Sequence, residues 1–79
     1  MRSADLRQIV ADVLEIDPDL LHSDADLTKF TGFTSVAVLT LMIELDTQAA
    51  IKMLPEEAGK LRLYRDIERV VERHGLILS

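Results

Sequence analysis

The apolar residues near the start of the chain return every three or four positions, as they do along one face of a helix. Five of them form a continuous face: Leu6, Ile9, Val10, Val13 and Leu14. We expect a helix from about Ser3 to Ile16, with Ser3 as its N-cap. It should end there because Pro18 disfavours helical geometry in the residue before it. An amphipathic face of this kind needs another element to bury it.

The next stretch, residues 17–32, reads DPDLLHSDADLTKFTG and has the composition of a connection. A connection of this length is uncommon unless it is held in place or functional. Four apolar residues could hold it against the core: Leu20, Leu21, Leu27 and Phe30. The pattern therefore predicts a long loop that lies over the core.

The segment SVAVLTLMIEL, residues 35–45, is almost wholly apolar and could be a helix or a buried strand by period alone. A strand needs a partner strand, and no other segment alternates apolar with polar residues. We therefore expect a second helix that begins at Thr34 or Ser35 and ends at about Ala49.

Two further helices complete the pattern. PEEAGK predicts a short one with Pro55 at its first position, and the last should run from about Leu63 to His74. Its apolar face holds Leu63, Ile67, Val70 and Val71, with Tyr64 expected at the edge of the core. Opposite charges at helical spacing predict ion pairs on the other face: Arg62–Asp66, Arg65–Glu68 and Arg69–Glu72. The expected fold is all-α, a small four-helix bundle in one domain, residues 1–79, with a long loop between the first two helices.

Composition narrows the classes of function. The chain has 79 residues and no cysteine, so it can form no disulfide. Its two histidines, His22 and His74, lie far apart in the sequence, so no metal-ligand spacing is present. Both histidines are expected to be solvated. The formal net charge is −5, with −7 on residues 1–59 and +2 on residues 60–79. The negative charge of residues 1–59 would repel the phosphate backbone, so nucleic-acid binding is disfavoured. A DNA-binding helix-turn-helix is therefore a distant third hypothesis, after the two functions derived from the second helix. The N-terminal segment is neither a signal peptide nor a membrane span, so a cytoplasmic protein is expected.

The residues at the start of the second predicted helix form the candidate functional site. Gly32 would let the chain turn sharply, Phe33 would pack back over the core, and Thr34 would cap the helix. Ser35 then falls in the first turn, where the helix dipole stabilises a negative group attached to it. No basic cradle, glycine-rich phosphate loop or neighbouring base accompanies Ser35, so an attachment point fits it better than a catalytic nucleophile.

Together these features resemble the acyl carrier protein family over nearly the whole chain. Gly32 stands at the family's glycine, Ser35 at its modified serine and Val36 at the leucine that follows. The resemblance extends to Leu27 in the loop, to the inward positions Leu41, Met42 and Leu45, and to the third-helix start at Pro55, Glu56 and Glu57.

The resemblance implies a carrier that is not an enzyme and that acts as a monomer without nucleic acid or a membrane span. A phosphopantetheinyl transferase would attach 4′-phosphopantetheine from coenzyme A to Ser35. The thiol of this arm would carry an acyl or aminoacyl thioester from a loading ligase to downstream enzymes in fatty-acid-like, polyketide or other specialised biosynthesis.

The chain also departs from the family pattern. Thr-Ser-Val replaces the usual Asp-Ser-Leu, and the second helix has only Glu44 and Asp46 in place of a row of acidic residues. Either this helix is more deeply buried, or partners dock on it by apolar contact. The candidate partner-recognition residues are Val36, Ala37, Val38, Leu39 and Ile43. These departures indicate a specialised member, and they leave an alternative function: an unmodified helical interaction module that acts through its apolar second helix.

Overall fold

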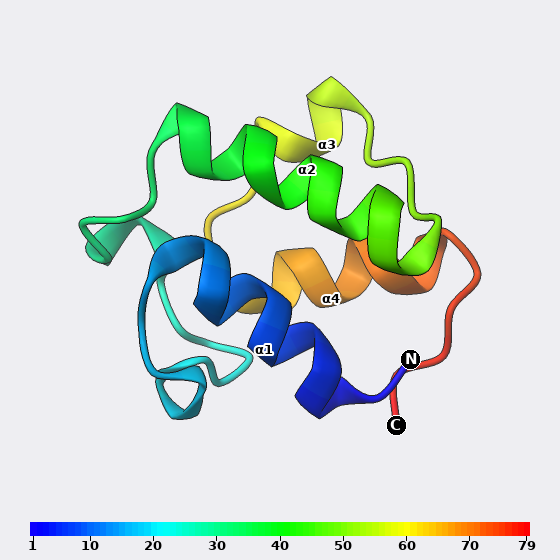
Figure 1. Ribbon diagram of the computed structural model, residues 1–79, viewed down its shortest axis with the longest axis horizontal. Helices are drawn as coiled ribbons and strands as arrows, with labels where there is room; N and C mark the ends of the chain where they lie inside the picture. The colour runs from blue at the N-terminus through cyan, green and yellow to red at the C-terminus, as the bar shows by residue number, and fades with distance from the viewer.

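The computed structural model describes residues 1–79 and is built from helices without strands. The elements follow in the order α1 (Ser3–Leu14), η1 (Pro18–Leu20), η2 (Leu27–Lys29), α2 (Ser35–Ala49), α3 (Pro55–Ala58) and α4 (Tyr64–Arg73), where η marks a short 3-10 helix. Figure 1 shows α1, α2 and α4 as the three longer helices and α3 as a short turn after α2. The predicted all-α four-helix arrangement with a long first connection is confirmed.

One hydrophobic core joins the helices. The apolar face predicted for α1 is buried at Leu6, Ile9, Val10 and Leu14, and Val13 packs against the core from its edge. The fully buried residues on the other helices include Leu45, Ile67, Val70 and Val71. Full burial of one such side chain contributes about 1.5–3 kcal/mol, so this shared core contributes strongly to the stability of the fold.

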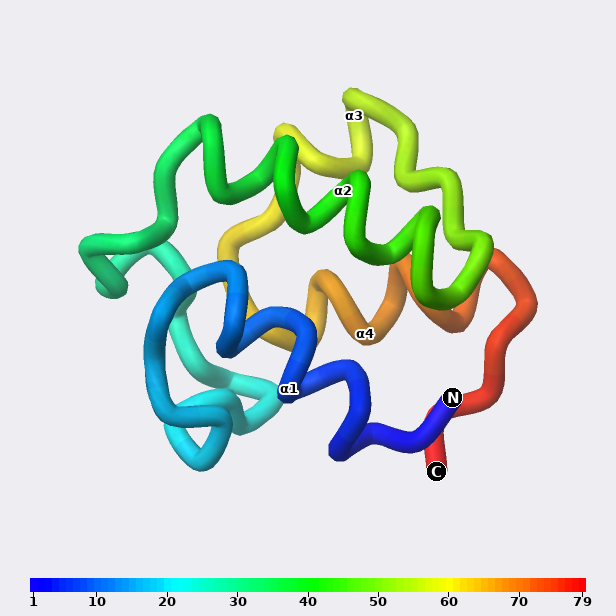
Figure 2. The backbone as a smooth tube through the Cα atoms, in the orientation of Figure 1, coloured from blue at the N-terminus to red at the C-terminus, as the bar shows by residue number.

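The two ends of α1 differ from the predicted ones. Arg2 is the N-cap and Ser3 is already helical, so the prediction of Ser3 as N-cap is wrong. The Ser3 N–H instead donates to the Ser79 carbonyl over 2.8 Å, and Figures 1 and 2 show the two termini side by side. At the other end the helix stops at Leu14 rather than Ile16, because Glu15 adopts a left-handed conformation with φ 58°.

The long connection after α1 is held against the core, and its path to α2 can be followed in Figure 2. Leu21 and Leu27 are buried, and Phe30 is half-buried against the core. Leu20, however, is 48% exposed, so the prediction that it holds the loop is wrong. Three of the four expected contacts therefore exist.

Backbone hydrogen bonds tie this connection to the segment before α4. The Leu27 N–H donates to the Arg62 carbonyl over 2.7 Å, and the Tyr64 N–H donates to the Ala25 carbonyl over 2.9 Å. The Asp26 carboxylate caps η2 and accepts from the Thr28 hydroxyl over 2.6 Å, which lowers the pKa of Asp26. The loop is therefore anchored by backbone pairing as well as by apolar contact.

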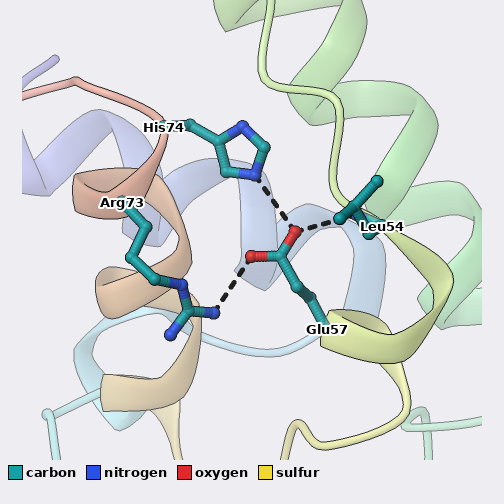
Figure 3. A network of polar contacts seen from close by, with 4 residues as sticks. All are labelled: Leu54, Glu57, Arg73 and His74. Atoms are coloured by element: carbon teal, nitrogen blue, oxygen red, sulfur yellow. Dashed lines mark hydrogen bonds and ion pairs between the residues drawn. The ribbon is translucent and has the colours of Figure 1, made fainter.

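A polar network joins the start of α3 to the end of α4 (Figure 3). Glu57 Oε1 accepts from the Leu54 N–H over 2.9 Å and lies 3.1 Å from His74 Nε2, while Glu57 Oε2 accepts from Arg73 Nη2 over 3.0 Å. The backbone N–H of Leu54, followed by His74 and Arg73, lowers the pKa of Glu57 to about 2. His74 is exposed, as expected, but its ring also contacts the Glu57 carboxylate.

The ion pairs predicted along α4 do not form. Asp66 instead accepts hydrogen bonds from the backbone N–H groups of Arg62 and Leu63, over 3.0 and 2.9 Å, and so caps the first turn of the helix. Burial pushes the pKa of Asp66 upward, but these two N–H groups and the neighbouring arginines leave it lowered overall. The absent pairs are Arg62–Asp66, Arg65–Glu68 and Arg69–Glu72.

Tyr64 lies inside the core rather than at its edge, which corrects the prediction. The residue is 1% exposed, and its hydroxyl is buried without a hydrogen-bond partner. Burial raises the pKa of the Tyr64 hydroxyl, with a smaller contribution from Glu68. The phenol therefore stays neutral, and its unpaired hydroxyl is a local cost to stability.

Candidate functional site

Thr34 sets the start of α2. It has extended backbone geometry, and its hydroxyl accepts a hydrogen bond from the Ala37 N–H over 3.1 Å. The Val38 N–H donates to the Thr34 carbonyl over 3.0 Å and begins the helical ladder. The predicted cap is confirmed, and Ser35 becomes the first helical residue.

Ser35 presents a free hydroxyl at this helix end. The residue is exposed and its side chain makes no hydrogen bond. The backbone N–H groups of Ser35 and Val36 also donate no hydrogen bond, because Thr34 satisfies only the next two. An anion attached to the Ser35 oxygen would meet two open donors and the positive end of a fifteen-residue helix dipole. This donor set fits a phosphodiester on the serine.

Gly32 is required for a different reason from the one expected. Its φ is not positive, so a left-handed turn does not explain it. A Cβ at this position would lie 2.4 Å from the Leu14 carbonyl oxygen, in the last turn of α1. The attachment loop, Gly32, Phe33 and Thr34, therefore packs its backbone at Gly32 directly on the end of α1. Phe33 packs against the core, as predicted.

No catalytic base accompanies Ser35. Its hydroxyl contacts neither histidine, because His22 is exposed on the long loop and His74 is bonded to Glu57 at the end of α4. No side-chain group capable of holding a metal ion is found anywhere in the fold. A serine without a base is suited to being modified by another protein rather than to attacking a substrate itself.

Three large apolar side chains of α2 face outward. Val36, Leu39 and Ile43 are 71%, 60% and 63% exposed, and Val38 is half-buried. The inward positions Leu41 and Leu45 are buried, and Met42 packs at the edge of the core, as predicted. Ala37 is only 7% exposed, so its assignment to the recognition surface is wrong. The hypothesis that this helix lacks acidic residues because it is more deeply buried is therefore wrong.

A small apolar cavity lies behind the attachment loop. Its volume is about 10 Å³, about the least that holds one water molecule. Its lining is wholly hydrophobic and comes from α1, the long loop, α2 and α4: Val10, Val13, Leu14, Leu27, Phe33, Ala37, Val38, Leu41 and Ile67. In this conformation the core is closed beneath Ser35.

The sequence did not show that one acidic side chain of α1 and one of α2 line the same groove. Asp12 of α1 and Glu44 of α2 line one groove between these helices. Asp12 lies within the turns of α1 that carry the apolar face, so its place on that helix was predictable. Only the packing of α1 on α2 brings it into the same groove as Glu44.

Comparison with known proteins agrees with the fold. Residues 4–72 match the family described as "Phosphopantetheine attachment site". The chain is 23% identical to an acyl carrier protein of Bdellovibrio bacteriovorus, over 89% of this chain and 90% of that protein. It is 25% identical to the acyl carrier proteins of Campylobacter curvus, over 90% and 92%, and of Wolinella succinogenes, over 86% and 90%.

The fold and the exposed serine define a small helical carrier domain. The chain belongs to the phosphopantetheine attachment site family, because that family matches most of its length. Its members are carriers rather than enzymes, and they bear 4′-phosphopantetheine as a covalent group. No helix is long and apolar enough to cross a membrane.

Proposed function

We propose that Ser35 carries the 4′-phosphopantetheine arm and that residues 1–79 act as a single carrier domain. The observation that carries this proposal is the exposed, unbonded hydroxyl of Ser35 beside two open N–H donors at the start of α2. A phosphopantetheinyl transferase would join the serine oxygen to the phosphate of coenzyme A, with departure of the nucleotide half. The transferase must supply the base for the serine proton, because the chain places none there.

Gly32, Phe33 and Thr34 would position this serine. Gly32 seats the loop on the end of α1, Phe33 anchors it on the core, and Thr34 fixes the first turn of α2. The family's aspartate before the serine is replaced by Thr34, which keeps the cap and removes one negative charge from the site. The arm would then extend into solvent from a rigid base.

The proposed cargo is an acyl or aminoacyl group, bound as a thioester to the arm. A dedicated ligase would load it, and downstream enzymes of a fatty-acid-like, polyketide or other specialised pathway would accept it, in the cytoplasm and with the carrier as a monomer. The closed cavity of about 10 Å³ supports a cargo held outside the core in this conformation. Val36, Val38, Leu39 and Ile43 would form the partner-recognition surface, because α2 exposes them beside Ser35.

Intact mass spectrometry tests the attachment site. The purified chain is incubated with coenzyme A and a broad-specificity phosphopantetheinyl transferase, and one phosphopantetheine adduct is expected. Ser35→Ala should abolish the adduct, and the matched variant Thr31→Ala, which removes an exposed hydroxyl four residues earlier, should keep it. Circular dichroism shows whether each variant is folded. An adduct that survives Ser35→Ala would refute the proposal.

The exposed apolar surface of α2 also favours a second candidate function. The same fold could serve as an unmodified interaction module that binds partners through Val36, Leu39 and Ile43. This function predicts that partner capture is unaffected by Ser35→Ala and that protein isolated from the native cell lacks the arm. Native protein bearing phosphopantetheine would exclude it.

A further inference from the structure

A groove lies between α3 and α4, and its volume is about 390 Å³. Its walls come from the two helices and from the residues that flank them: Leu54, Glu56, Glu57, Lys60, Leu61, Asp66, Arg69, Val70 and Arg73. None of these residues belongs to the attachment loop or to α2. A short segment bound in this α3–α4 groove would therefore leave Ser35 exposed.

Most carboxylates of the α3–α4 groove are bonded within the chain. Glu57 accepts from the Leu54 N–H and from Arg73, as Figure 3 shows. Asp66 accepts from two backbone N–H groups at the start of α4. Of the three carboxylates in the lining, Glu56 alone has no hydrogen bond. The acidic groups of the groove therefore serve mainly to hold the first turns of α3 and α4.

The cations of the groove are less occupied. Lys60 and Arg69 are exposed and form no ion pair. Arg62, whose backbone N–H donates to Asp66, adds a third exposed and unpaired cation beside the groove. Ammonium and guanidinium groups carry donors alone, and the planar guanidinium matches the two oxygens of a carboxylate. The groove therefore offers free donors to an acidic ligand.

Apolar surface accompanies these cations. Leu54, the N-cap residue of α3, is 50% exposed and lines the groove. Leu61 and Val70 also line it, although both are buried in the core. A ligand that fills the groove would therefore meet a large apolar side chain together with the two unpaired cations.

The charge of this part of the chain is opposite to that of the rest. Residues 60–79 carry a formal charge of +2, and residues 1–59 carry −7. The chain as a whole repels an acidic molecule, so such a molecule would be drawn only to the region that contains the unpaired cations. The charge distribution therefore favours a partner of a different kind from one attracted by the acidic residues.

We propose that the α3–α4 groove docks an acidic, amphipathic segment of a partner protein. Carboxylates of that segment would bond to Lys60 and Arg69, and an apolar side chain would cover Leu54. The inference rests on the proposed carrier function for the identity of the partner, a loading enzyme or a downstream enzyme of the same pathway. Because the groove shares no residue with the attachment loop or α2, this partner would hold the carrier while another enzyme acts on the arm at Ser35.

An acidic peptide tests the groove. A short helical peptide of leucine and glutamate is titrated into the isotopically labelled chain at low salt, where charge attraction is strongest, with a peptide of leucine and lysine as its control. Amide shifts are expected at Leu54, Lys60, Arg69 and Val70 with the acidic peptide and not with the basic one. The absence of shifts, shifts confined to other elements, or equal shifts with both peptides would overturn the proposal.

Matched double variants separate the groove from the net charge of the chain. Lys60→Gln with Arg69→Gln removes one lysine and one arginine from the groove, and Lys29→Gln with Arg2→Gln removes one of each from exposed positions outside it. The groove variant should weaken binding of the acidic peptide about five- to tenfold, and the outer variant less than about twofold. Equal losses would show that only net charge matters and would refute the docking surface. Circular dichroism and a thermal melt show whether both variants remain folded.

Two other occupants of the groove would also overturn the proposal. Binding of anionic phospholipid vesicles through Lys60 and Arg69, without binding of the peptide, would assign the surface to a membrane. Self-association that depends on the same two residues would identify a second copy of the chain.

The peptide measurement is independent of the arm, because it needs neither coenzyme A nor a transferase. Absence of the Ser35 adduct would refute the attachment site alone. Absence of groove-dependent peptide binding would refute the docking surface alone.

Discussion

Replacement of Gly32 by alanine tests whether the attachment loop depends on its backbone contact with α1. The added Cβ would lie 2.4 Å from the Leu14 carbonyl oxygen and 3.2 Å from the carbonyl carbon. The nearer distance is about 1 Å shorter than ordinary van der Waals contact, and both neighbours are backbone atoms that no rotamer change can move. Either the loop or the last turn of α1 must shift.

The expected cost of Gly32→Ala is about 1–3 kcal/mol in the free energy of unfolding, the range for overpacking a tight site. In a domain of this size a loss of about 2 kcal/mol lowers the melting temperature by roughly 8–16 °C. Urea unfolding followed by circular dichroism gives the free energy, and a thermal melt gives the temperature.

Gly59→Ala provides a matched control. Its Cβ would lie 3.5 Å from the Pro55 carbonyl oxygen, an ordinary contact, and Gly59 has helical geometry with φ −69°. Alanine there should leave stability unchanged or raise it by about 0.4–1 kcal/mol. If Gly32→Ala unfolds at the same urea concentration as the wild type and as Gly59→Ala, the loop does not depend on this contact.

Three further predictions concern the core and the α3–α4 network. Leu45→Ala should cost about 2–5 kcal/mol by urea unfolding, whereas Leu39→Ala, at an exposed position, should cost little; equal effects would contradict the assignment of Leu45 to the core. Tyr64→Phe should raise stability by about 1 kcal/mol, because it removes a buried hydroxyl without a partner, and a clear loss in the thermal melt would show that the hydroxyl is bonded. The pKa of Glu57 is lowered from its ordinary 4.5 to about 2, so its contribution to stability is present above pH 4.5 and lost as the pH falls through about 2. Glu57→Gln should therefore be less stable than the wild type at neutral pH and lose less stability on acidification; parallel pH profiles of the urea midpoint would refute this.

Local sequence patterns determined the helices and the place of Ser35 at the start of α2. The helical period of α1 and α4, the cap at Thr34 and the proline at the start of α3 act within one or two turns, so they can be read without tertiary contacts. Ser35 was found in the same way, because its place in the first turn follows from the cap alone. These local signals also carry the family resemblance, which the match over residues 4–72 confirms.

Errors arose where a side chain had several available partners. Asp66 was expected to pair with Arg62, but it accepts hydrogen bonds from backbone N–H groups instead. Arg73 at the end of α4 bonds to Glu57 of α3. Exposed charges at helical spacing gain little from pairing, so such pairs are easily replaced by a better-held partner. Leu20 and Ala37 were misplaced for a related reason, because burial depends on the path of the loop and the rotation of α2.

The sequence by itself therefore determined which segments are helical, where α2 begins and which hydroxyl stands at its first turn, because each depends on neighbours in the chain. Only the tertiary structure decided why a side chain at Gly32 would strain the fold, where the Glu57 carboxylate is bonded, and that Asp12 and Glu44 line one groove between α1 and α2. These features depend on the packing of helices that are distant in sequence, and periodicity within one segment does not specify how two segments meet.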